Sequence, residues 1–251
     1  MKYRNHIARA FGASLAAAAM VAGTGVAAQA ASATIVSYVN FNGATKLSLN
    51  GSAVLVSPAV GSPRALRLTA NKKSQRGAAW APVQTDPTKS FLTTFTVQMK
   101  HSTVAGDGIA FVLQGTGKKI VGGVGGGLGY SGIKPSLAVE FDTFANPFDM
   151  NANHIDVVTG GNSEVSNIAA RAPLAMAGST FKVTIAYEAK AHSMKVWVNS
   201  AAKPGMGALT INKKVDVAAA VGTAPVNVGF TGATGSAFAT QDILDWTMSN
   251  G

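Results

Sequence analysis

The chain has 251 residues, with 21 Lys and Arg against 11 Asp and Glu, a formal net charge of +10 and no cysteine. The lack of cysteine excludes disulfides, thiol catalysis and cysteine-ligated zinc, so packing, with or without a bound metal, must stabilise the fold. The positive charge can favour acidic polymers, anionic cell surfaces or nucleic acid. The basic residues are scattered, however, and no nucleic-acid motif occurs. We interpret the charge mainly as a solvated surface, with a bias towards anionic glycans as the alternative.

The first thirty residues have the layout of a secretory signal peptide. Basic residues (Lys2, Arg4 and Arg9) precede an alanine-rich apolar stretch over residues 10–22, and small residues follow up to Ala30. That stretch is shorter than the ~20 apolar residues of a membrane span. We expect cleavage after Ala30, or after Ala33 as a second choice, and a secreted product, periplasmic or extracellular. The alternative is an uncleaved N-terminal anchor.

The remaining residues, 31–251, alternate apolar and polar side chains in short runs that Gly, Pro, Asn and Ser interrupt. This period of two is typical of the many short strands of an all-β sandwich or barrel. No internal repeat, linker or convincing amphipathic helix appears, so we expect one β-sandwich domain. The expected strands are Ile35–Phe41, Ala65–Thr69, Leu92–Met99, Gly108–Leu113, Leu137–Phe144, Phe181–Glu188, Ser193–Asn199, Val226–Thr231 and Ile243–Met248.

A glycine-rich stretch, Gly122–Gly132, lies between two of these strands. It does not end in the Gly-Lys-Ser/Thr of a phosphate-binding loop, and no helix follows it. We therefore expect a surface loop and no nucleotide site.

Acidic residues gather in one part of the chain, at Asp107, Glu140, Asp142, Asp149 and Asp156. Side chains alternate along a strand, so Glu140 and Asp142 share one face of the Leu137–Phe144 strand. Two like charges there repel each other unless a cation lies between them. The alternative is an ordinary solvated strand end and turn, since Asp and Asn favour turns.

The loop after this strand, Thr143–Asn153, adds Asn146 and Asp149, and His154 opens the next strand. Carboxylates, an amide oxygen and backbone carbonyls suit calcium, which takes six to eight oxygen ligands. An imidazole beside carboxylates suits a first-row transition ion such as manganese. The segment therefore offers ligands for both kinds of ion.

The order Glu140-Phe141-Asp142-Thr143-Phe144-Ala145-Asn146, then Asp149 and His154, resembles the metal-binding signature of legume-type (L-type) lectins. The resemblance implies a concanavalin-like jelly-roll β-sandwich of antiparallel sheets that binds glycans in a calcium-dependent way and is not an enzyme. We expect a secreted bacterial member of that family. The implied ligands of the transition ion, Mn²⁺ or another divalent ion, are Glu140, Asp142, Asp149 and His154. Those of Ca²⁺ are Asp142, the Phe144 carbonyl, Asn146 and Asp149.

Further segments resemble the family's sugar-binding loops: Gly106–Phe111, Gly125–Gly129, and Val228–Gly235 with Asp242–Trp246. The resemblance implies a cis peptide before an aspartate that accepts sugar hydroxyls, a glycine amide that reaches the sugar, and an aromatic ring against the pyranose. The implied sugar-binding residues are Asp107, Gly126, Phe144, Asn146, Ser236 and Ala237. The family also pairs back sheets, so a homodimer is possible.

Four positions depart from the family pattern. Gly106 replaces the usual alanine, Met150 a common proline, Asp156 a glycine, and Gln241 a frequent histidine. We regard these departures as tolerable in a distant relative.

Two other functions stay open. Glu140 and Asp142 are candidate acid and base of a glycoside hydrolase on a related scaffold, but such hydrolases place a second Glu where this chain has Phe144. The second open function is that of an adhesive or structural protein with a degenerate sugar site. Nucleophilic catalysis is disfavoured, because no Gly-x-Ser-x-Gly elbow occurs and His101 and His192 have no acidic partner at motif spacing.

Overall fold

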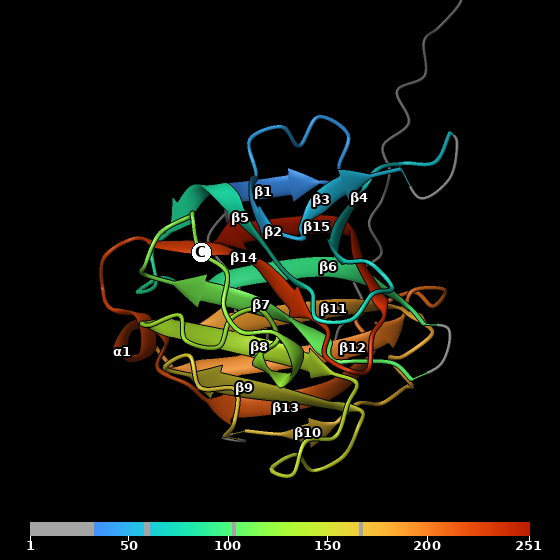
Figure 1. Cartoon of the computed structure of the whole chain (residues 1–251). Helices are drawn as coiled ribbons and strands as arrows, with labels where there is room; N and C mark the ends of the chain where they lie inside the picture. The colour runs from blue at the N-terminus through green and yellow to red at the C-terminus, as the bar shows by residue number, and fades with distance from the viewer. Residues whose placement is uncertain (1–32, 58–60, 102–103, 166–167) are drawn as a thin grey trace, which may run out of the picture. The chain divides into compact units, whose positions relative to one another are not determined.

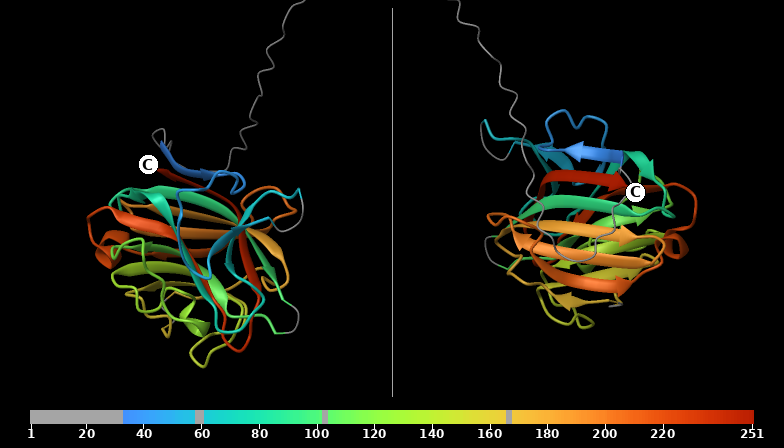
Figure 2. Two further views of the ribbon diagram at one scale, coloured as in Figure 1. Left: turned by 45° about the horizontal axis from the view of Figure 1, so that its top comes forward. Right: turned by 180° about the vertical axis from the view of Figure 1, so that it is seen from behind.

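Two antiparallel sheets pack face to face in the computed structural model, which describes residues 33–57, 61–101, 104–165 and 168–251 (Figure 1). The candidate signal peptide lies outside the described residues. An 8-stranded sheet follows the order β13-β12-β11-β6-β15-β4-β3, with β1 also paired to β15; a 7-stranded sheet follows β10-β9-β8-β7-β14-β5-β2. Seen from behind, the 8-stranded sheet lies in front (Figure 2, right). The expected all-β sandwich is confirmed.

The described strands have these bounds: β1 Ala33–Tyr38, β2 Ser48–Gly51, β3 Val54–Val56, β4 Ala65–Thr69, β5 Arg76–Thr85, β6 Phe91–Lys100, β7 Gly108–Gln114, β8 Ser136–Asp142, β9 His154–Thr159, β10 Ala170–Arg171, β11 Thr180–Glu188, β12 Ser193–Ser200, β13 Ala208–Lys214, β14 Val226–Ala233 and β15 Thr240–Asn250. A short 3₁₀ turn, η1, covers Gly125–Gly127, and a short helix, α1, covers Val217–Val221. None of the described helices is long and apolar enough to span a membrane.

The core between the sheets centres on aromatic side chains that alternate inward from both layers. Phe95 on β6 and Trp246 on β15 face Phe230 on β14, with ring centroids 4.8 and 4.9 Å apart in edge-to-face geometry. Phe111 on β7 stacks on Phe95 at 5.9 Å. All four rings are fully buried. These contacts stabilise the sandwich beyond the burial of apolar area alone.

A second, smaller apolar cluster lies on the outer face of the 7-stranded sheet. Leu128, Tyr130 and Ile133 pack there with Trp80 of β5, and all four are buried. The Trp80 indole N–H also donates to the Ile120 carbonyl at 3.0 Å. The glycine-rich stretch is therefore a loop on the outer face, as expected, and its buried side chains hold it over β7 and β8.

The strands β2, β3, β10 and β13 were not among the expected strands, and β1 ends at Tyr38 instead of Phe41. Three further differences bear on the sequence pattern. β5 was not expected; its first half is buried on both faces and lacks polar alternation. α1 is too short to show a helical period; Asp216 caps it by accepting from the Ala219 N–H. β8 ends at Asp142, so Phe144 lies in the following loop and not in the strand.

Candidate functional site

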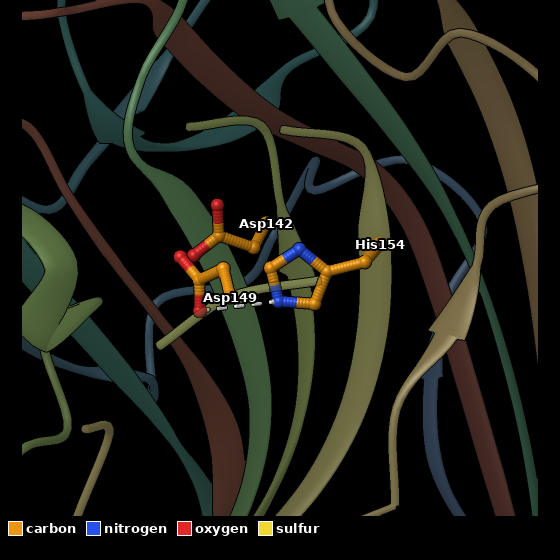
Figure 3. Close-up of side chains that lie close together, drawn as sticks. All are labelled: Asp142, Asp149 and His154. Atoms are coloured by element: carbon orange, nitrogen blue, oxygen red, sulfur yellow. Dashed lines mark ion pairs between the residues drawn. The ribbon is translucent and has the colours of Figure 1, made fainter. Parts of the chain in front are cut away.

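Three candidate metal ligands meet where β8 ends and β9 begins (Figure 3). The strand register places Asp142 directly opposite His154, and the loop between them returns Asp149 to the same place. One ligand atom from each of the three lies within 4.8 Å of the others. A two-strand register therefore brings together residues that are twelve positions apart in the sequence.

His154 is held with one nitrogen directed at this group. Its Nδ1 lies 2.7 Å from the Asn151 carbonyl, which can only accept, so Nδ1 carries a proton. Nε2 lies 3.6 Å from Asp149 Oδ1 and is left with a lone pair when the ring is neutral. This is how metal-binding histidines are usually oriented.

The loop after β8 is folded around its own acidic side chains. Asp142 Oδ1 accepts from the Phe144 N–H at 2.7 Å, and Asp149 Oδ2 accepts from the Asn146 N–H at 2.6 Å. Asn146 Oδ1, in contrast, is buried and has no hydrogen-bond partner. An oxygen acceptor in that condition is costly unless a cation or a donor reaches it, so the loop fits a calcium ion.

Glu140, the fourth implied ligand of the transition ion, lies on the same face of β8 but outside the three-residue group. Its carboxylate is buried and accepts a hydrogen bond from the Tyr130 hydroxyl. Burial, and to a lesser degree the nearby carboxylate of Asp156, raises the pKa of Glu140 to about 8. Asp156 is engaged elsewhere, since its Oδ1 accepts from the N–H groups of Val157 and Ile168.

Burial also raises the pKa of Asp142 well above its usual range, and that of Asp149 in the same direction. The neighbouring carboxylates contribute to both shifts through like-charge repulsion. Such a group of acids either holds protons or binds a cation. The arrangement is chemically suited to a divalent ion.

Asp107, the implied sugar acceptor, lies just before β7 and beside the end of β8, because Gly108 pairs with Asp142. The Gly106–Asp107 peptide is cis. Thr143 donates twice to the Asp107 carbonyl, from its N–H at 2.8 Å and from its hydroxyl at 2.9 Å. The carboxyl is only 4% exposed, its Oδ2 has no partner, and burial raises its pKa to about 6.

Gly126 and Asn146 are in direct contact beside Asp107. A Cβ atom at Gly126 would lie 2.8 Å from Asn146 Oδ1, so only glycine allows this approach. The preceding residue, Gly125, donates to the Thr234 carbonyl at 3.1 Å and thereby joins η1 to the loop after β14. The structure thus brings Asp107, Gly126 and Asn146 together.

The remaining implied sugar-binding residues differ in exposure. Phe144 is half-buried and Ser236 is exposed, but Ala237 is only 4% exposed. The Ala237 methyl faces Gly106: a Cβ at Gly106 would lie 2.6 Å from it. The departure from alanine at Gly106 is therefore explained by the side chain of Ala237.

Sequence reasoning missed the contribution of Gln241. Its side-chain amide donates to the carbonyls of Gly106 and Ala233 at 3.3 and 3.2 Å, and so ties the segment before Asp107 to the end of β14. The sequence signal was the departure from histidine at this position. Tyr130 left no comparable signal, because its approach to Glu140 depends on how the glycine-rich loop packs.

A polar cavity of about 270 Å³ adjoins the site on the side of Gly126 and Asn146 that is lined by Phe148, Ser163 and Glu164. None of these three residues was expected at the site. Phe148 lies in the β8–β9 loop, whereas Ser163 and Glu164 lie in the loop between β9 and β10, so no local spacing in the sequence connects the two loops.

His192 does have an acidic partner, contrary to the expectation from motif spacing. Its Nδ1 lies 3.5 Å from Asp216 Oδ2, and both side chains are about half exposed, at 52% and 46%. Asp216 also caps α1, and His192 occupies the β11–β12 turn with a φ of 46°. The pair connects that turn to the start of α1.

Comparison with known proteins identifies relatives of the whole sandwich. The family profile described as legume lectin beta-barrel domain matches residues 36–244. A bark agglutinin of Robinia pseudoacacia is 30% identical over 167 residues, which are 64% of this chain and 59% of the agglutinin. The chain thus spans less than two thirds of that relative's length.

Solved lectin structures share the fold over most of their length. Basic winged bean lectin, solved with the Tn-antigen, is 27% identical, with a TM-score of 0.70, over 82% of this chain and 92% of the lectin. Arcelin-5, a lectin-like defence protein from Phaseolus vulgaris, is 20% identical, with a TM-score of 0.72, over 88% of this chain and 99% of arcelin-5. At that identity arcelin-5 supports the fold alone. On the match over residues 36–244, the chain belongs to the legume-type lectin family.

Proposed function

We propose that this chain is a carbohydrate-binding protein whose sugar site is ordered by calcium and a neighbouring transition ion. The observation that carries the proposal is a pair of buried oxygens without partners, Asp107 Oδ2 and Asn146 Oδ1, next to the Asp142, Asp149 and His154 group. A hydroxyl donor at the first oxygen and a cation at the second would satisfy both.

The metal half of the proposal depends on ligand chemistry. Asn146 Oδ1, the Phe144 carbonyl and the carboxylates of Asp142 and Asp149 would hold calcium. His154 Nε2, with Asp142, Asp149 and Glu140, would hold Mn²⁺ or another divalent ion. The ions would supply positive charge for the buried carboxylates and rigidity for the loop. Because protons compete for the same oxygens, cation affinity should fall as the pH falls.

The sugar half uses groups of this chain only. Asp107 would accept from sugar hydroxyls, while the Asn146 amide and the Gly126 N–H would donate to them. The Phe144 ring would cover the C–H side of a pyranose, and the backbone near Ser236 and Ala237 would close the far side. That basic winged bean lectin was solved with the Tn-antigen supports a glycan as the class of ligand.

Non-enzymatic binding is favoured over glycoside hydrolysis. The Glu140 carboxyl is buried and engaged by Tyr130, so it is a poor candidate for a general acid that must reach a substrate. Export through the first thirty residues, a bacterial origin and pairing of back sheets into a homodimer stay predictions alongside this function.

The experiment that tests the proposal is a glycan array probed with residues 31–251 in calcium and manganese, in EDTA, and after calcium is restored. We expect binding that EDTA abolishes and calcium restores. Asp107→Asn should abolish glycan binding but leave calorimetric calcium binding within about twofold, because Asp107 is not an implied ligand. Asp142→Asn should lose both.

Two outcomes would contradict the proposal. Glycan binding that survives thorough chelation would rule out ordering by metal. Release of reducing sugar from a polysaccharide panel, lost in Glu140→Gln, would favour the hydrolase.

A further inference from the structure

A basic segment lies directly against the loop that borders the candidate sugar site. The Thr234 hydroxyl donates to the Lys72 carbonyl at 2.8 Å and accepts from the Gln75 N–H at 2.9 Å. The Ser74 N–H donates to the Gly235 carbonyl at 3.2 Å, and the Thr234 N–H donates to that of Gln75 at 2.9 Å. Segment 70–76 is thus fastened to the loop by four hydrogen bonds.

Gly235, to which this segment is bonded, lies next to the sugar acceptor. A Cβ atom at Gly235 would be 3.1 Å from Asp107 Oδ2 and 3.3 Å from the Gly125 Cα. Lys72 is therefore connected to Asp107 through the contacts of two residues, Thr234 and Gly235. A saccharide of two or more rings bound at Asp107 would be long enough to reach the segment.

Three cationic side chains of this segment, Lys72, Lys73 and Arg76, are exposed, and together we name them the basic rim. Arg76 opens β5 and donates from Nη1 to the Gly122 carbonyl at 3.1 Å, which leaves its other N–H groups free for a ligand. No Asp or Glu precedes Asp86 in the chain, so the segment itself holds no acid that could neutralise the rim.

An acidic side chain also borders the site. Glu164 lines the 270 Å³ cavity beyond Gly126 and Asn146, and its side chain is exposed. An anionic group on the ligand would be attracted to the basic rim and repelled by Glu164. Asp107 itself would repel an anion on the sugar ring that it binds, so the anionic group belongs on a neighbouring ring.

We infer that the preferred ligand is an acidic glycan, in which a sulfate ester or carboxylate on the ring next to the one at Asp107 contacts the basic rim. This inference rests on the proposed sugar-binding function and specifies its ligand class. Arg76 suits either anion through paired N–H groups, and Lys72 and Lys73 act as point charges. Exposed contacts of this kind are screened by salt, with a Debye length of about 8 Å at 0.15 M.

The experiment compares matched disaccharides that bind the wild-type protein in calcium: a neutral one, its sulfated form and its form with a terminal carboxylate sugar. We expect at least one acidic form to bind about three- to tenfold more tightly than the neutral one at low salt. The preference should shrink towards unity as NaCl is raised to ~1 M. The sulfate and carboxylate arms identify which anion is favoured.

Two charge-matched variants assign the effect. Lys72→Ala/Lys73→Ala should remove most of the preference but leave the affinity for the neutral disaccharide unchanged. Lys203→Ala/Lys213→Ala removes the same charge from exposed positions of the β12–β13 region in the other sheet and should leave the preference intact.

Four results would overturn the inference. Equal affinity for neutral and acidic forms would do so, and would leave the proposed sugar site standing. Equal loss in both double variants would show that net charge, and not the basic rim, is responsible. Absence of any glycan binding would reject the inference together with the proposed function, and equally tight binding of polyphosphate in EDTA would indicate unspecific attraction.

Discussion

At the scale of single residues, the site depends on compensations between positions far apart in the chain. Gly106 lacks a side chain at a position where a Cβ atom would lie 2.6 Å from the Ala237 Cβ, so the methyl of Ala237 fills that space. Gln241 bonds the Gly106 carbonyl from a third position. Each change looks like a simple departure from the family pattern, but together they form one packed contact behind Asp107.

We predict that Gly106→Ala destabilises the protein by about 1–3 kcal/mol, because the new methyl would lie 2.6 Å from the Ala237 Cβ. Thermal unfolding would report this as a lower midpoint, by about 2–4 °C per kcal/mol for a domain of this size. Glycan affinity should also fall, because Asp107 is the next residue in the chain and a shift of Gly106 would move it.

The matched control is the double variant Gly106→Ala/Ala237→Gly, which exchanges the two side chains. It should recover most of the midpoint that the single variant loses. If Gly106→Ala alone is as stable as the wild type, the packing account of this departure is wrong.

At the scale of elements, the site is assembled by the β8–β9 pair and by the glycine-rich loop over the outer face of the 7-stranded sheet. The register of β8 and β9 aligns Asp142 with His154. Leu128 and Tyr130 anchor the loop, and its η1 turn then meets Asn146. A rigid strand pair and an anchored loop position the ligands more accurately than a free loop would.

We predict that Gly126→Ala weakens sugar binding by about tenfold, which corresponds to the loss of roughly one hydrogen bond. The added methyl would lie 2.8 Å from Asn146 Oδ1 and would displace the amide that we propose to bind both sugar and calcium. Calorimetry should therefore show weaker calcium binding as well.

Gly123→Ala is the control on the same loop, because its Cβ would meet the Ser131 Cβ at 3.5 Å and the Gly127 Cα at 3.6 Å, which are ordinary contacts. It should bind sugar and calcium like the wild type. If Gly126→Ala binds sugar and calcium as tightly as the wild type does, the η1 turn does not contribute to the site.

At the scale of the whole molecule, the aromatic core and the site occupy different places. The core lies between the sheets, whereas the acidic group lies where β8 ends and β9 begins. Removal of metal should therefore loosen the site but leave the sandwich folded.

We predict that EDTA lowers the melting midpoint by about 5–11 °C for each ion that is otherwise present at ~100 times its dissociation constant, a contribution of about 2.7 kcal/mol per ion. The far-UV circular dichroism of a β-sheet should persist at 25 °C. The midpoint of Asp142→Asn should not respond to added calcium, and a response equal to that of the wild type would contradict the assigned site.

The sequence alone predicts the features that depend on residues close together in the chain. Alternation along β4, β6, β11 and β12 is a local property, and it predicted those strands closely. β5 lacks this alternation and was not predicted, whereas β7, which is also buried on both faces, was. The cluster from Glu140 to His154 was predictable because its order of residues resembles the metal-binding signature of the family; strand period placed only Glu140 and Asp142 on one face.

The sequence by itself therefore determined the all-β class, the family and the candidate metal ligands. Only the tertiary structure decided that Ala237 packs on Gly106, that Tyr130 engages Glu140, and that Lys72 lies beside Thr234. These contacts join loops from different strands, and their distances depend on how the sheets and the outer loop pack. No spacing along the chain encodes them, so the sequence could not show that Lys72, Lys73 and Arg76 belong to a segment beside the candidate sugar site.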